Sequence, residues 1–281
     1  MIVSPLRTYV RRLRIWQSII DNVRPLDRRS RSAFRRSVIA CPFTSAQRLR
    51  VWQDPILLGP ATVEVAEFGK FNLRPRTDDL WHVTPRREPH VSAEIRSRLR
   101  PGDTFVDAGA NIGVFTVQAA RIVGAHGKVI AIEMVPFTAT ILRENISLNE
   151  SANVTVVERA ISANEGEIVK LSVRQEQAGQ ATIVLHEREQ TGDVFSVCTT
   201  TLGTILKDVD RVALMKIDIE GAELSALQGA GEHLRKIEAI IFESLPGSDR
   251  VEDFLAESGY RLRQLQGRNF LAEREGADAT T

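Results

Sequence analysis

Three acidic residues follow short apolar segments at points where strands of a parallel sheet would end. Asp107 follows Thr104-Phe105-Val106, Glu133 follows the segment 128–132, and Asp218 follows the segment 211–217. Because the carboxyl ends of parallel strands meet at one edge of a sheet, we expect the three carboxylates to lie close together. Such an edge suits a ligand with an ammonium or sulfonium centre better than it suits a diphosphate.

A short loop of small residues follows the first acid and opens into the helical pattern of residues 114–123. Its spacing is Asp107, Gly109, Asn111, Gly113. This loop differs from the G-x-G-x-x-G loop that cradles a pyrophosphate, because an acid at the strand end would repel phosphates. The loop therefore favours S-adenosylmethionine, with Glu133 placed to accept the ribose hydroxyls. A dinucleotide site also holds its ribose with an acid at this position, so Glu133 alone does not discriminate between the two ligands.

Four blocks of the sequence resemble the FkbM-type S-adenosylmethionine-dependent methyltransferases in their order and spacing: DAGANIGVFTVQAA, VIAIEMVPFTATILRENISLN, NVTVVERAIS and LMKIDIEGAELSALQGA. The resemblance covers about residues 101–259. It implies an α/β fold of the class I methyltransferase type, with a Rossmann-like, doubly wound sheet that is mostly parallel and carries an antiparallel C-terminal strand pair. In the family a proline directly follows the second acid, whereas Met134 and Val135 precede Pro136 here.

The residues after the third strand, expected at 153–157, are candidates for contact with the adenine of the cofactor. The resemblance points to Ala160, and the acid Glu158 is the second candidate. Gly109, Asn111 and Gly113 are the loop candidates, and the three strand-end acids complete the predicted cofactor set.

Asp218 and Glu220 are the candidate catalytic residues. They alternate with Ile217 and Ile219, so both carboxylates face one side while the chain stays extended. Two carboxylates at a ligand edge are hard to explain by packing alone. One of them can accept a proton from the methyl acceptor, the pair can hold a divalent cation, or Asp218 can bind the ammonium group of the cofactor while Glu220 faces the acceptor. The sequence leaves these alternatives, and the need for a metal, open.

Glu88, His90 and Glu243 are candidate residues on the substrate side, and Trp81 and His82 are candidates at the mouth of the site. The resemblance places the segment around Glu88 in a flap over the cofactor, and Glu243 follows a fifth strand expected at 237–242. Each of these side chains can equally be an ordinary surface group.

Charge is distributed unevenly along the chain. Residues 1–50 hold 12 arginines and two aspartates, a net +10, so the remainder carries −9 of the total of +1. Apolar residues recur every three or four positions from Leu6 to Val23, which predicts a basic amphipathic helix that ends at Pro25. Packing on its own domain or on a second subunit is the commonest use of such a helix, and contact with a membrane or glycolipid is the alternative. Basic and aromatic residues do not interleave as in base-stacking proteins, so nucleic acid is not expected.

The pattern divides the chain into four parts. We expect a basic helical extension at 1–58 with a second helix at 27–39, a hairpin and flap at 59–100, a methyltransferase domain at 101–275 and a disordered tail at 276–281. Residues 79–89 read as an irregular loop and 174–191 as a polar insertion. Cys41 and Cys198 form no disulfide framework or zinc motif, and no apolar run reaches the ~18 residues of a membrane span, so a cytoplasmic location is expected.

The combined prediction is an O-methyltransferase acting on a hydroxyl of a sugar, glycolipid or polyketide-like metabolite. The acceptor class is implied by the resemblance alone. N-methylation, a binding protein without turnover and a dinucleotide-dependent oxidoreductase are the alternatives.

Overall fold

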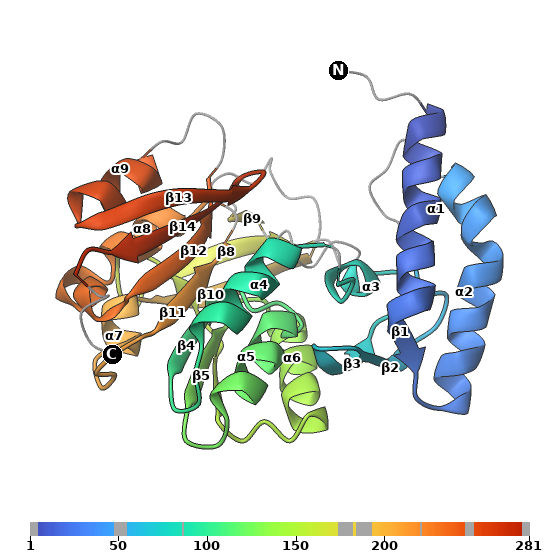
Figure 1. Cartoon of the computed structure of the whole chain (residues 1–281), viewed down its shortest axis with the longest axis horizontal. Helices are drawn as coiled ribbons and strands as arrows, with labels where there is room; N and C mark the ends of the chain where they lie inside the picture. The colour runs from blue at the N-terminus through green and yellow to red at the C-terminus, as the bar shows by residue number, and fades with distance from the viewer. Residues whose placement is uncertain are drawn as a thin grey trace.

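The computed structural model describes residues 5–47, 55–85, 87–173, 182–183, 193–219, 221–244 and 250–276. Its centre is a seven-stranded sheet of order β13-β14-β12-β11-β4-β5-β6 (Figure 1). The strands are β4 Thr104–Ala108, β5 Lys128–Ile132, β6 Val154–Val157, β11 Leu214–Ile217, β12 Ala239–Glu243, β13 Tyr260–Gln266 and β14 Asn269–Arg274. The first five are parallel, and β13 and β14 form an antiparallel pair in which β14 also runs antiparallel to β12. The predicted doubly wound sheet is confirmed.

Helices cover both faces of this sheet, because neighbouring residues of each buried strand point to opposite sides. In β4, Phe105 packs with α4 and α5, while Val106 packs with α7 and α8. The first face carries α4 Pro89–Arg98, α5 Val114–Val123 and α6 Pro136–Leu148. The second carries α7 Leu202–Ile205, α8 Glu223–Gln228, the 3-10 helix η3 Gly231–Lys236 and α9 Arg250–Glu257. Continuous apolar strands follow from this burial on two sides.

An antiparallel helix pair stands at one end of the molecule beside a small sheet (Figure 1). The pair is α1 Pro5–Asn22 and α2 Arg28–Gln47, and the sheet holds β1 Val23–Pro25, β2 Ala61–Val65 and β3 Gly69–Leu73. The helix at the N-terminus and the hairpin are as predicted, whereas β1 was not expected. The prediction that the second helix ends at Ile39 is wrong, since α2 continues through Pro42 to Gln47 and buries Cys41 in the core.

One hydrophobic cluster joins the helix pair to the rest of the molecule. Trp16 of α1 meets Phe34 of α2 edge to face at 6.5 Å, and the same cluster contains Phe71 of β3, Leu80 and Val117 of α5. The hydrophobic core is therefore continuous across residues 58 and 100, where the sequence suggested boundaries. Of the tail predicted to be disordered, residues 277–281 lie outside the described part of the chain.

A second small sheet lies beside the start of α6. Its order is β7-β10-β8-β9, with β7 Ala160–Ile161, β8 Ile168–Val173, β9 Thr182–Ile183 and β10 Asp193–Thr200. Phe195 of β10 and Phe137 of α6 lie 5.7 Å apart, which fixes the sheet against the carboxyl side of β5. Apart from β9, the predicted insertion at 174–191 falls outside the described residues.

The segment 79–89, expected to be irregular, contains the short helix α3 Asp79–His82 and the first residue of α4. A search of the described ranges finds no helix with the length and apolarity that crossing a membrane requires.

Candidate active site

A pocket of about 940 Å³, partly open to solvent, lies at the carboxyl ends of β4, β5 and β11. We call it the strand-end pocket. These three strands are neighbours in the order β11-β4-β5, so the tips that carry Asp218, Asp107 and Glu133 are brought together as expected. The lining residues are His82, Arg87, Gly109, Ala110, Asn111, Ile112, Val114, Phe115, Ile132, Glu133, Met134, Val135, Arg159, Ile161, Lys216, Asp218, Ile219 and Ala222.

Gly109 and Gly113 of the loop are glycines for different structural reasons. Gly109 has φ +83°, and a Cβ placed there would lie 2.0 Å from the Asp218 carbonyl oxygen, so only glycine lets the loop pass over the end of β11. Gly113 has φ +91° and precedes α5, and a Cβ there would meet Leu142 of α6 at 2.6 Å. Gly109 lines the pocket, whereas Gly113 does not. The lack of a side chain at Gly113 makes room for Leu142 of α6, and the contact of Gly113 with the cofactor stays a prediction.

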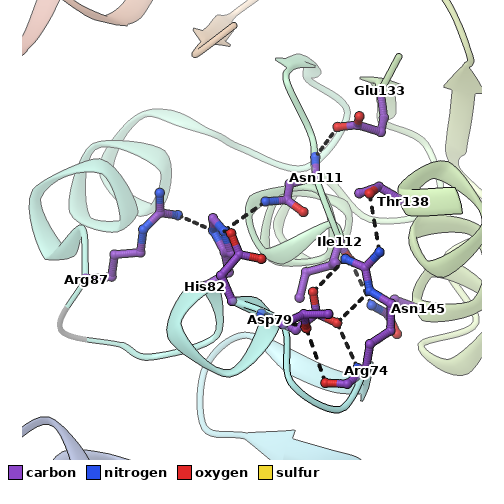
Figure 2. Close-up of polar contacts among 11 residues, drawn as sticks. Arg74, Asp79, His82, Arg87, Asn111, Ile112, Glu133, Thr138 and Asn145 are labelled. Carbon is purple, nitrogen blue, oxygen red and sulfur yellow. Dashed lines mark hydrogen bonds and ion pairs between the residues drawn. The ribbon is translucent and has the colours of Figure 1, made fainter. Parts of the chain in front are cut away.

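Glu133 is buried and orders the loop opposite. Its Oε2 accepts a 2.8 Å hydrogen bond from the backbone N–H of Asn111 (Figure 2), and its Oε1 accepts one of 2.9 Å from the N–H of Val135. Burial raises the pKa of Glu133 to about 7 against the effect of these two donors. The bond to Val135 also explains the two additional residues before Pro136: they form the turn through which α6 begins at Pro136. Each carboxylate oxygen keeps a lone pair for a further donor.

Asp107 lies beneath the loop and does not line the pocket. Its Oδ2 accepts a 2.6 Å hydrogen bond from the Thr116 hydroxyl, while its buried Oδ1 has no hydrogen-bond partner among the described residues. Burial raises the pKa of Asp107, although Lys216 and Thr116 oppose the shift. An unsatisfied buried carboxylate oxygen is costly, which is a sign of a site that a donor completes.

Lys216 connects the two acids of β4 and β11. Its Nζ donates to Asp218 Oδ2 at 3.2 Å and lies 5.5 Å from the centre of the Phe115 ring. Burial alone would lower the pKa of Lys216, but the charges of Asp218, Asp107 and Glu88 outweigh it and raise the pKa. In turn Lys216, with Arg87, lowers the pKa of Asp218 against the effect of burial. Asp218 is therefore held as an anion.

Glu223 fixes the turn that follows Asp218. One carboxylate oxygen of this buried residue accepts hydrogen bonds of 3.1 Å from the backbone N–H groups of Ile219 and Gly221. The predicted catalytic residue Glu220 lies outside the described residues. The carboxylate at the beginning of α8 is favourably placed, because backbone N–H groups at a helix start lack partners.

A flap of residues 74–88 closes one side of the pocket (Figure 2). Arg74 holds its base through two bonds to buried Asp79, of 2.7 Å from Nη2 and 2.9 Å from Nε. His82 then reaches the cofactor loop, with Nε2 3.1 Å from Asn111 Nδ2 and 3.2 Å from Asp78. Arg87 donates to His82 Nδ1 at 2.6 Å. Because an arginine can only donate, Nδ1 is the acceptor, the ring proton is on Nε2, and Nε2 donates to Asp78 Oδ2. The amide nitrogen of Asn111 is also a donor, so its contact with Nε2 is one of packing and not a hydrogen bond.

Several predicted residues lie outside the pocket lining. Glu158 is exposed and pairs with Arg143 at 2.7 Å, and Ala160 is buried in β7, while its neighbours Arg159 and Ile161 line the pocket. The sequence pattern predicted this segment, but the side chains that line the pocket are those of the neighbouring residues, because the chain leaves β6 and joins a second sheet there. The adenine contact of Ala160 and Glu158 stays a prediction.

The three substrate-side candidates also lie outside the pocket lining. Glu88 is 3.4 Å from Arg87, Glu243 pairs with Arg268 at 2.7 Å, and His90 Nδ1 lies 3.2 Å from Gln266 Oε1. None of the three lines the pocket within the described chain, and neither does Trp81, whereas His82 does.

Sequence reasoning missed Lys216, Arg87, Arg159 and Glu223. A signal for Lys216 was present, since a lysine two residues before Asp218 in a buried strand shares its face. For Arg87 and Arg159 the sequence offered none, because both lie in loops whose direction only the folded chain sets.

Comparison with known proteins shows the family of this chain. The model of the Methyltransferase FkbM domain matches residues 107–262, which is more than half of the chain. This chain belongs to the FkbM methyltransferase family. It is therefore an S-adenosylmethionine-dependent methyltransferase of the Rossmann-like class, as the sequence predicted.

The three similar proteins that follow are each less than 30% identical to this chain. Methyltransferase sdnD of Sordaria araneosa is 26% identical over 197 residues, covering 58% of this chain and 75% of the relative. Methyltransferase 1 of Beauveria bassiana is 27% identical over 165 residues, covering 51% of this chain and 65% of the relative. The solved structure of Methyltransferase FkbM from Methylobacillus flagellatus KT is 16% identical with a TM-score of 0.43, covering 94% of this chain and 59% of that one. The assignment depends on the family match and on the strand order, not on this last likeness.

The residues of the strand-end pocket fit the cofactor of the FkbM family. Glu133 and Asp218 supply carboxyl oxygens as acceptors, the loop supplies backbone next to Gly109, and Ile112, Ile132 and Ile161 supply an apolar wall for a purine. The buried Oδ1 of Asp107 is an acceptor that lacks a donor in the described chain. Metal dependence is still open: within the described ranges no three or more His, Cys, Asp or Glu residues gather as a metal site, and Glu220 is not among them.

Proposed function

We propose that this FkbM methyltransferase transfers a methyl group to a hydroxyl of a sugar, glycolipid or polyketide-like metabolite. The bound cofactor supplies an electrophilic methyl carbon on a sulfonium. The observation that carries the proposal is the pocket at three adjacent strand tips, where the carboxylates of Glu133 and Asp218 are placed as acceptors for the ribose hydroxyls and the ammonium group of the cofactor. The hydroxyl acceptor class comes from the family resemblance.

Within this proposal Glu133 holds the ribose hydroxyls. Its two oxygens are fixed by the N–H groups of Asn111 and Val135, so the carboxylate is oriented before the ligand arrives. Fixed acceptors lose little freedom on binding, which increases affinity.

Asp218 binds the ammonium group of the cofactor and does not act as the base. The support is the contact with Lys216, which lowers the pKa of Asp218 and so makes it a weak proton acceptor. Of the three alternatives that the sequence left open, this one assigns the proton of the acceptor to Glu220. Glu223 holds the backbone N–H groups of Ile219 and Gly221, the chain neighbours of Glu220.

The flap contributes position and not chemistry. His82 on Asn111 and Arg87 on His82 close the pocket, which holds an acceptor against the methyl carbon and excludes water. Holding two reactants in near-attack geometry supplies much of the rate of a displacement reaction.

Calorimetric titration with S-adenosylhomocysteine and with NAD tests the cofactor part. We expect binding of the first only, and tight binding of NAD alone would exclude the assignment. The acceptor part is tested with pairs of an alcohol and an amine on the same carbon skeleton, with the methylated atom located by NMR. Methylation of the nitrogen in every pair would replace the hydroxyl proposal by N-methylation. Cofactor binding without product from any acceptor would indicate a binding protein.

The roles of the acids separate in the same assays. Asp218→Asn should weaken S-adenosylhomocysteine binding, whereas Glu220→Gln should leave binding unchanged and depress turnover. A Glu220→Gln variant with full turnover would remove Glu220 as the base.

A further inference from the structure

The helix pair α1 and α2 leaves a basic surface and an apolar end exposed. The amphipathic pattern of α1 is mostly used in packing, since Trp16, Ile19 and Val23 are buried in the core. Four large apolar side chains remain exposed in the half of the pair farthest from the connection at 23–27: Leu6 at 71%, Val10 at 40%, Ile39 at 74% and Phe43 at 70%. We call these four residues the apolar tip.

The exposed face of α2 continues from the apolar tip as a row of arginines. Arg28, Arg31, Arg35, Ile39 and Phe43 follow one another at intervals of three and four residues, so they share one side of the helix. The opposite side buries Ala33, Phe34 and Cys41. A surface hollow on this face is lined by Arg28, Arg31, Ser32, Arg35, Arg36 and Ile39.

These arginines form no ion pair within the described chain, although the charge of Asp27 acts on Arg31. Five arginines and no acidic residue occur in α2. No ion pair to Arg28, Arg31 or Arg35 is formed among the described residues. The nearest acid in sequence, Asp27, uses its carboxylate to accept from the N–H and hydroxyl of Ser30 at 2.8 and 2.6 Å. The positive charge of this face is therefore available to a partner.

The order of groups along α2 matches the layers of a membrane surface. With a rise of about 1.5 Å per residue, Arg35 lies roughly 6 Å and Arg31 roughly 12 Å from Ile39 along the axis. Apolar groups of interfacial helices enter about 5–10 Å into the headgroup boundary, and basic groups then lie at the phosphates. We propose that the helix pair docks on an anionic lipid bilayer, with the apolar tip inserted and the arginine row on the headgroups.

Two other occupants explain the surface less well. A second copy of the chain would bring one arginine row against another, and like charges repel. A nucleic acid would use the arginines and could stack a base on Phe43, but it would leave Leu6, Val10 and Ile39 uncovered, and the single tryptophan of this helix pair, Trp16, is buried rather than available for stacking.

Flotation of the full chain with phosphatidylcholine vesicles, with and without phosphatidylglycerol, tests the proposal. We expect binding only to the anionic vesicles, with affinity that falls as salt rises. The variant Arg28→Gln/Arg31→Gln/Arg35→Gln should lose about a hundredfold in affinity, at about fivefold for each arginine near an anionic surface. The control Arg121→Gln/Arg250→Gln/Arg261→Gln has the same net charge and should bind as the wild type does.

The apolar part has its own matched pair. Ile39→Asp should weaken vesicle binding. Ile168→Asp should not, although Ile168, in β8 of the second small sheet, is 77% exposed and so offers an equally exposed isoleucine. No binding to anionic vesicles, equal loss in both triple variants, or equal effects of the two aspartates would overturn the proposal. So would tighter binding to single-stranded RNA than to vesicles, or self-association that the Ile39→Asp variant abolishes. Circular dichroism confirms that each surface variant is folded.

Discussion

Replacement of Lys216 by methionine should uncover the two acids that this lysine neutralises. Methionine keeps the length and apolar stem of lysine but leaves Asp218, and the charge of Asp107 behind it, without a cation in the buried part of the site. The variant should be less stable, and the pKa of Asp218 should rise once its main lowering influence is gone.

The magnitude follows from the 3.2 Å contact between Lys216 Nζ and Asp218 Oδ2. At an effective dielectric constant of about 20, two charges at this distance attract by roughly 5 kcal/mol. The Asp218 side chain is 24% exposed, so solvent screens part of this attraction. We expect a coupling free energy of about 2–3 kcal/mol between the two side chains, which is within the range measured for contacting residues.

A double-mutant cycle measures this coupling. The free energy of unfolding is taken from urea titrations of the wild type, Lys216→Met, Asp218→Asn and the double variant. Each single variant should be destabilised, and the double variant should recover much of the loss because no unpaired charge remains at β11. Additive single effects would refute the reasoning, since they would mean that the lysine and the carboxylate stabilise the fold independently.

Three further predictions concern the loop and its acids. Glu133→Gln should weaken S-adenosylhomocysteine binding about tenfold to a hundredfold in calorimetry, because a charge-assisted acceptor is lost, while Glu158→Gln, at the exposed ion pair with Arg143, should bind as the wild type does; equal losses would return Glu158 to the site. Gly109→Ala should destabilise the protein by more than about 2 kcal/mol, as a severe core mutation does, because its Cβ would lie 2.0 Å from the Asp218 carbonyl oxygen. Gly102→Ala, where φ is +91° and no atom lies within 4 Å of the added Cβ, should show only the smaller cost of its backbone conformation. Similar unfolding midpoints of the two variants would exclude the steric explanation. The pKa of Glu133 is raised from 4.5 to about 7 in the folded state, so the folded state binds more protons than the unfolded state between these pH values. The stability that this group contributes at low pH is therefore lost as pH rises to about 7. Urea titrations across this interval should show a fall in the free energy of unfolding, of order ~3 kcal/mol at most, that is absent in Glu133→Gln.

The sequence by itself determined the central sheet and its ligand edge. Apolar runs that end in Asp107, Glu133 and Asp218 specified buried parallel strands, and parallel strands must bring their carboxyl ends to one edge. The sequence also predicted that Gly109 lies in a tight turn, but it did not show that the carbonyl group of Asp218 is what excludes a side chain there. Local patterns sufficed here because strand period, burial and turn residues are properties of neighbouring positions.

Tertiary structure alone decided which side chains meet in the pocket. Arg159 rather than Glu158 faces it, because the chain changes sheets after β6, and His82 reaches Asn111 only because Arg74 and Asp79 hold the flap across a gap in sequence of 29 residues. The pKa of Asp218 was likewise beyond the sequence, since it depends on the direction of the Lys216 side chain and on the charge of Arg87 from another element. Contacts between distant segments depend on the packing of whole elements, and this is information that no local pattern carries.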